Sequence, residues 1–148
     1  MNSTLLIGFK GKNNLSGLLV KRPGRECCLL TNSFSGLKKD IDTIGTEYDR
    51  VILFGVDKTL ADEVRIENIA EKDGARCTSA LDLNRMAEAF RKAGLETKVS
   101  ESPTAYLCNE AYWHLLRKFS GRAVLIHIPT MKNADELFIP KVRQALDF

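Results

Sequence analysis

The sequence predicts a single α/β domain in which a central, mostly parallel sheet lies between two layers of helices. Three observations favour this three-layer α/β/α fold. Short apolar runs alternate along the chain with segments of helical periodicity. Several of the runs are β-branched and unbroken, which is typical of strands buried on both faces. The chain has 148 residues without a linker, repeat or low-complexity stretch, so we assign residues 1–148 to one domain.

The first half of the chain contains four candidate strands and one candidate helix. We expect strands at Thr4–Phe9, Cys27–Leu30, Arg50–Gly55 and Val64–Glu67. The third is the clearest, because it is β-branched and ends on a glycine, while the fourth alternates apolar and charged residues like a half-buried strand. Between the second and third strands, apolar residues at helical spacing predict a short helix over Gly36–Ile44.

The second half alternates helices and strands more regularly. In order, we expect a helix at Leu81–Gly94, a strand at Glu96–Val99, a helix from Ser102 or Thr104 to Phe119, a strand at Val124–Ile128 and a helix at Asn133–Leu146. Ser79 with Asp82 resembles a capping box at the start of the first of these helices. The apolar strands around Val51 and Val124 are expected inside the sheet.

Composition excludes several classes of function. The net charge of +3 is small and the basic residues are dispersed, which argues against a nucleic-acid partner. No apolar run is long enough to span a membrane, and Met1–Phe9 is too short and too uncharged for a signal peptide. We therefore expect a cytoplasmic protein with free thiols. The four cysteines lack Cys-x-x-Cys spacing and only two histidines are present, so we expect neither a metal nor another cofactor.

Two residues occupy positions where α/β proteins place their sites, at the carboxyl ends of strands and the amino ends of helices. Cys108 lies in the first turns of a predicted helix, where the N-terminal amides favour a thiolate and lower a cysteine pKa. His127 lies near the end of an apolar strand, and a buried histidine needs a polar partner. A thiol is one such partner.

Structural explanations of these residues stay open at this point. Cys108 and Tyr112 belong to one apolar stripe of their helix, so Cys108 could be a core residue. His127 could be a structural histidine. Glu67 shares a strand face with Arg65, which by itself indicates a surface ion pair. The other histidine, on a different helical face, is expected at the surface.

The remaining candidates have structural interpretations. That second histidine is His114, six residues after the cysteine on the same predicted helix. Cys27, Cys28 and Cys77 have no histidine near them in sequence and are interpreted as buried fillers.

Two segments carry a more specific pattern. Ser100–Asn109 contains a serine, a short stretch, an aromatic residue, one apolar residue and Cys-Asn, and Leu125–Pro129 continues an apolar strand into His-apolar-Pro. They resemble the nucleophile and histidine motifs of pyroglutamyl peptidase I, also called pyrrolidone carboxyl peptidase. Ile66–Ala70 is similar to the segment that holds the family's acidic residue, and Leu6–Phe9 to its opening strand and Gly-Phe turn. The resemblance spans nearly the whole chain and is strongest from Leu81 to Pro129.

The resemblance implies a Cys-His-Glu site. Cys108 would attack the amide carbonyl that follows the lactam ring, His127 would act as its general base, and Glu67 would orient the imidazole. The substrate-binding residues that it implies are Phe9, Tyr106 and Asn109. The implied activity is a cysteine peptidase of the omega type that removes N-terminal pyroglutamate (5-oxoproline) from peptides with a blocked N-terminus.

Two alternatives stay open beside that activity. The same site could act on another small amide or lactam, or the chain could be an inactive member that binds a ligand or a protein. The sequence also leaves open whether the chain forms a homo-oligomer.

The chain departs from the family's pattern around the substrate pocket and the oxyanion region. It is shorter, mainly between Ala70 and Ser79, and Lys10–Asn13 holds no second early phenylalanine. The departures at motif positions are Val56–Thr59 in place of a glycine-rich loop, Pro103–Ala105 in place of Ala-Gly-Thr, and Asn68 in place of the arginine that follows the glutamate.

Overall fold

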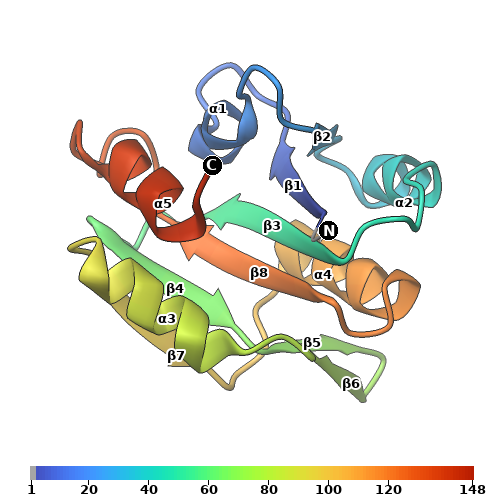
Figure 1. The fold of residues 1–148 in the computed structure, drawn as a ribbon. Helices are drawn as coiled ribbons and strands as arrows, with labels where there is room; N and C mark the ends of the chain where they lie inside the picture. Colours follow the sequence, from blue (N-terminus) through green and yellow to red (C-terminus); the bar gives the residue numbers. More distant parts are fainter. Residues whose placement is uncertain (1–2) are drawn as a thin grey trace.

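The computed structural model describes residues 3–148, which form a six-stranded sheet covered by helices on both faces (Figure 1). The elements, in chain order, are β1 (Thr4–Phe9), α1 (Leu15–Val20), β2 (Cys27–Leu30), α2 (Phe34–Asp42), β3 (Arg50–Val56), β4 (Glu63–Glu67), β5 (Ile69–Lys72), β6 (Ala75–Thr78), α3 (Leu83–Lys92), β7 (Glu96–Ser100), α4 (Tyr106–Lys118), β8 (Ala123–Ile128) and α5 (Phe138–Leu146). No helix within residues 3–148 is long and apolar enough to cross a membrane.

The strands of the main sheet follow the order β2-β1-β3-β8-β4-β7. Every neighbouring pair is parallel except β4 and β8, which run antiparallel, so the sheet is mostly parallel as expected. The strands that contain Val51 and Val124 are β3 and β8, and they pair with each other at the centre of the sheet. Their predicted place inside the sheet is confirmed.

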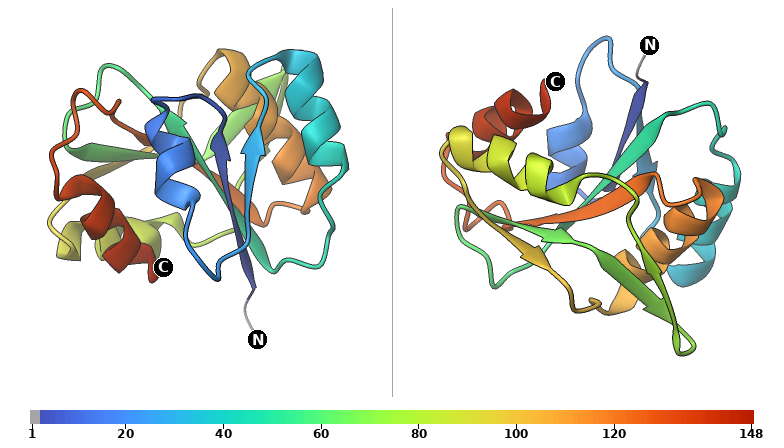
Figure 2. Two further views of the ribbon diagram at one scale, coloured as in Figure 1. Left: turned by 90° about the horizontal axis from the view of Figure 1, so that it is seen from above. Right: turned by 60° about the horizontal axis from the view of Figure 1, so that its bottom comes forward.

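Two apolar layers fill the space between the sheet and its helices, which confirms the three-layer prediction. Helices α1, α3 and α5 cover one face, where Leu19, Phe90 and Phe138 are fully or almost fully buried. Helices α2 and α4 cover the other face with Ile41 and Tyr112 (Figures 1 and 2). Alternate residues of each central strand point into opposite layers, which is why these strands are apolar throughout.

The predicted capping box is wrong, because Asp82 caps α3 alone. The Asp82 carboxylate accepts a hydrogen bond from the Arg85 amide at 3.0 Å. Ser79 instead donates its hydroxyl proton to the backbone carbonyl of Ala123 at 2.6 Å, which ties the segment before α3 to β8. A short polar side chain outside a helix can satisfy a strand carbonyl as readily as a helix amide.

Helix α4 begins later than expected and without a side-chain cap. Neither Ser102 nor Thr104 caps it, since the N-cap position is Ala105 and no side chain there accepts from the first amides. The first residue of the helix, Tyr106, has a φ of 63°, in the left-handed region. The first turn of α4 therefore presents backbone N–H groups that the cap residue leaves unsatisfied.

The sequence prediction omits helix α1 and the two-stranded sheet formed by β5 and β6. The β5–β6 hairpin packs against α4, where the side-chain amide of Asn109 accepts from the Glu71 N–H at 3.0 Å and donates to the Glu71 carbonyl at 2.7 Å. The hydroxyl of the buried Tyr112 donates to the carbonyl of Glu67 at 2.9 Å and lies 3.1 Å from that of Asn68. Helix α4 is thus fixed to both ends of the β4–β5 junction.

Removing the hydroxyl in Tyr112→Phe should lower the free energy of unfolding by about 1–2 kcal/mol, because it removes the buried hydrogen bond to the Glu67 carbonyl. Urea denaturation followed by circular dichroism would measure the change. Tyr106→Phe is the matched control, since the Tyr106 side chain is 84% exposed and should contribute little. Equal stability of Tyr112→Phe and the wild type would show that the hydroxyl does not hold α4 to the sheet.

Candidate active site

One face of the central sheet collects the polar residues of the site. In the strand register, Gly55 on β3 and Arg65 on β4 both lie directly beside His127 on β8. Glu67 follows Arg65 by two residues, so it points to the same face. Helix α4 covers this face and carries Cys108 in its first turn. Four elements therefore converge on a single spot.

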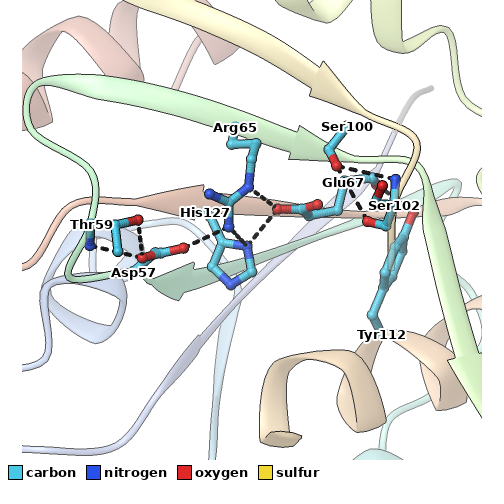
Figure 3. Close-up of polar contacts among 8 residues, drawn as sticks. All are labelled: Asp57, Thr59, Arg65, Glu67, Ser100, Ser102, Tyr112 and His127. Atoms are coloured by element: carbon cyan, nitrogen blue, oxygen red, sulfur yellow. Dashed lines mark hydrogen bonds and ion pairs between the residues drawn. The ribbon is translucent and has the colours of Figure 1, made fainter. Parts of the chain in front are cut away.

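His127 and Glu67 form a buried hydrogen bond at 2.8 Å between Nδ1 and Oε2 (Figure 3). The imidazole is almost fully buried and the carboxylate completely so. A nitrogen and a carboxylate oxygen at this distance share a proton, so Nδ1 is the donor, and Nε2 has a free lone pair whenever the ring is neutral. The pair sets both the ring orientation and the tautomer that a general base requires.

Gly55 leaves open a space that both the Cys108 thiol and the His127 ring border. A β-carbon on Gly55 would lie 2.6 Å from Cys108 Sγ and 3.4 Å from His127 Nε2. Any other residue at this position would therefore push against the sulfur and the edge of the imidazole. The structure therefore brings together Cys108, His127 and Glu67, in that order, from α4, β8 and β4.

The expected lowering of the Cys108 pKa is wrong. Burial raises its pKa to about 12, and the carboxylates of Glu67 and Asp57 add to the effect. The start of α4 favours the thiolate, yet removal of the sulfur from water and two nearby negative charges outweigh it. The resting thiol is therefore protonated near neutral pH, and only transfer of its proton to a base makes it nucleophilic.

Two charged residues that the sequence analysis did not assign to the site complete it. Arg65 donates from Nε to Glu67 Oε2 at 2.5 Å and from Nη2 to Asp57 Oδ2 at 2.6 Å (Figure 3). Glu67 is consequently not half of a surface ion pair, because its side chain is completely buried. Burial opposes the charge of Asp57, but hydrogen bonds from Thr59 and Arg65 outweigh it and hold its pKa well below the usual range.

A sequence signal for both residues existed. Arg65 and Glu67 are two residues apart on β4 and therefore lie on the same face of the sheet, and Asp57 comes directly after the last residue of β3. Polar residues at the ends of central strands are typical of α/β sites.

The structure separates the three predicted substrate-binding residues. Phe9 is 3% exposed and lies in the apolar cluster that also packs against Cys108. Tyr106 projects into solvent at the start of α4, and the Asn109 amide is bonded to Glu71 of the hairpin. Of the three, only Phe9 is buried on the same side of the sheet as the thiol.

Cys27 and the second histidine differ from their sequence interpretations. Cys27 is exposed and is not a buried filler, whereas Cys28 and Cys77 are partly buried and pack against the apolar core. His114 is not a surface residue, since its side chain is 16% exposed and its Nε2 lies 2.8 Å from Glu110. Within residues 3–148 no three side chains of the metal-ligating types are grouped to hold an ion.

Comparison with solved structures identifies the fold as that of pyrrolidone carboxyl peptidase. The enzyme from Thermococcus litoralis matches 99% of this chain and 92% of its own at 19% identity and a TM-score of 0.76. Pyroglutamyl peptidase I from Bacillus amyloliquefaciens matches 99% of this chain and 92% of its own at 18% identity and a TM-score of 0.73. A variant of the Pyrococcus furiosus enzyme matches 98% and 96% at 17% identity and a TM-score of 0.78.

Sequence comparison adds no closer relative. A scan against models of protein families finds no match, and a search of curated protein sequences finds none either. The chain is thus a divergent sequence on the pyrrolidone carboxyl peptidase fold.

Gly55→Ala should slow iodoacetamide alkylation of Cys108 by about 10²-fold near neutral pH, because the new methyl group forces the sulfur away from His127. Peptide mapping by mass spectrometry would give the rate. Gly45→Ala is the control, since a β-carbon there meets only the carboxylate of Glu47. Wild-type alkylation of Gly55→Ala would mean that the sulfur does not need this space to react.

Proposed function

We propose that the protein is a cysteine hydrolase that removes N-terminal pyroglutamate from peptides. The observation that carries the proposal is the placement of Glu67, His127 and Cys108 on one sheet face, with His127 Nδ1 bonded to Glu67 and both His127 Nε2 and the thiol bordering the space beside Gly55. The likeness in fold to pyroglutamyl peptidase I supports the substrate class.

The proposed mechanism begins with a protonated thiol. His127 Nε2 takes the proton of Cys108 as the sulfur attacks the amide carbonyl after the lactam ring, which forms a tetrahedral intermediate. The protonated ring then gives this proton to the leaving amine, and the C–N bond breaks to leave a thioester on the sulfur. Water, deprotonated by His127, cleaves the thioester and restores the thiol. Glu67 balances the imidazolium charge in both halves of the reaction.

The first turn of α4 is the proposed oxyanion site. Its amides point toward the end of the helix next to the sulfur, and Ala105 offers them no side-chain acceptor. Backbone N–H groups placed in this way stabilise the negative oxygen that develops on the carbonyl. The same turn thus positions the nucleophile and receives the charge that the attack creates.

The lactam of pyroglutamate is flat and neutral, which suits an apolar wall. We assign one wall to Phe9, which belongs to the buried apolar cluster that Cys108 packs against. Tyr106 is exposed at the start of α4, two residues before the nucleophile, and is assigned to the peptide side of the substrate. Asn109 would contribute by holding the hairpin against α4.

Turnover of a chromogenic pyroglutamyl amide should fall by at least about 10³-fold in Cys108→Ser and in His127→Ala. Glu67→Gln should cost about tenfold less, because an amide still orients the ring but no longer balances its charge. The losses should not add in double variants, since the three residues act as one unit.

Cys77→Ser and His114→Ala provide matched controls that remove a cysteine and a histidine outside the site. Thermal unfolding on every variant separates chemistry from packing. If Cys108→Ser turns over the amide at the wild-type rate, or loses stability instead of turnover, Cys108 is a core residue and the proposal is wrong.

A further inference from the structure

Arg65 is the only cation in direct contact with the candidate site among residues 3–148. It contacts Glu67, Asp57 and the imidazole of His127. Its Nε and Nη2 hold Glu67 and Asp57, and Nη2 also lies 3.3 Å from Nδ1 of His127. Its side chain is 26% exposed, so the charge is largely shielded from water. Burial opposes the positive charge, but the bonds to Glu67 and Asp57 raise the pKa of Arg65, which stays ionised.

Arg65 and His127 share a single oxygen atom. Both donate to Oε2 of Glu67, whereas Oε1 is buried and accepts no hydrogen bond within residues 3–148. Because the proton on Nδ1 is already given to Glu67, the guanidinium cannot donate to that nitrogen. It therefore faces the ring as a neighbouring positive charge. A cation in this place disfavours the protonated form of the imidazole.

The charged groups around His127 determine how Arg65 affects protonation of the ring. Strand β4 contributes Glu67 and Arg65, the segment after β3 contributes Asp57, and α4 contributes the neutral thiol of Cys108 and the neutral hydroxyl of Tyr112. With Arg65 the ring faces two negative charges and one positive charge. Without it, two carboxylates alone would favour a protonated ring, and a protonated ring cannot act as a base.

We propose that Arg65, anchored by Asp57, is a positioning residue that fixes the Glu67 carboxylate against His127 and keeps the imidazole unprotonated in the resting site. Its role in catalysis rests on the proposed hydrolase function, but its effect on His127 does not. Arg65 offsets part of the negative charge of Glu67 before the thiol proton reaches the ring. Glu67 therefore stabilises the imidazolium less strongly than a carboxylate without a cation beside it would.

The test is an NMR titration of the two histidines in the full chain. In Arg65→Gln, the pH midpoint for protonation of His127 should rise by about one pH unit. His114 should keep its midpoint in the same spectra, because its carboxylate partner is Glu110. Arg76→Gln is the matched control, since it removes an exposed arginine that pairs with Glu71.

Two further variants protect the test from a folding defect. Arg65→Met keeps the aliphatic stem and should give the same rise, whereas Arg65→Lys keeps a cation and should return the midpoint toward the wild-type value. An unchanged or lower midpoint in both neutral variants would overturn the proposal. So would an equal rise in Arg65→Lys, because a purely structural arginine would not be rescued by charge.

If the protein turns over a pyroglutamyl amide, the acid limb of its kcat/KM profile in Arg65→Gln should move to higher pH together with the NMR midpoint of His127. If the protein does not turn over the amide, the proposed function is wrong. The NMR titration alone then decides whether Arg65 has the proposed effect on His127.

Discussion

The candidate site depends on the absence of a side chain at one position, Gly55. Gly55 lies beside His127 in the register of two central strands, and the volume that its β-carbon would occupy borders both the Cys108 sulfur and the imidazole Nε2. Helix α4 can bring a nucleophile to the sheet only because the sheet is bare at this position. The packing constraint therefore precedes the electrostatics, since no arrangement of charges could act on a thiol held one side chain further away.

Around that position, charges of both signs lie close together in a mostly buried part of the protein. The Cys108 thiol, the His127 imidazole and two carboxylates bridged by one guanidinium lie on a single face of the sheet. Burial and the carboxylates raise the pKa of Cys108, so the resting state contains no ready-made thiolate. This arrangement favours a mechanism in which the base removes the thiol proton as the bond to the substrate forms, with His127 held in the required tautomer by Glu67.

The sequence predicts the layers and most of the main sheet because hydrophobic periodicity follows directly from burial. The strand Cys27–Leu30 matches, and Arg50–Gly55 falls within one residue of β3. The sequence does not predict helix α1, because six residues are too few to show periodicity. It does not predict the β5–β6 hairpin, because the charged residues of the hairpin are stabilised by α4 rather than by an apolar face of their own. The capping prediction for α3 failed because Ser79 found a strand carbonyl.

For the site, motif resemblance indicates Cys108, His127 and Glu67 but carries no information on the residues that surround them in space. The raised pKa of Cys108 and the role of Gly55 arise from contacts between residues far apart in the chain. Arg65 was interpreted as half of a surface ion pair because strand alternation does not reveal that a helix covers that face.

The most direct measurement is an acid quench of the protein during turnover of a pyroglutamyl amide, followed by intact-mass and peptide mass spectrometry. The account predicts a pyroglutamyl thioester on the peptide that contains Cys108, present in the wild type and absent in Cys108→Ser. Release of pyroglutamate without any acyl adduct, or an adduct on Cys27, Cys28 or Cys77, would contradict the assignment of Cys108 as the nucleophile.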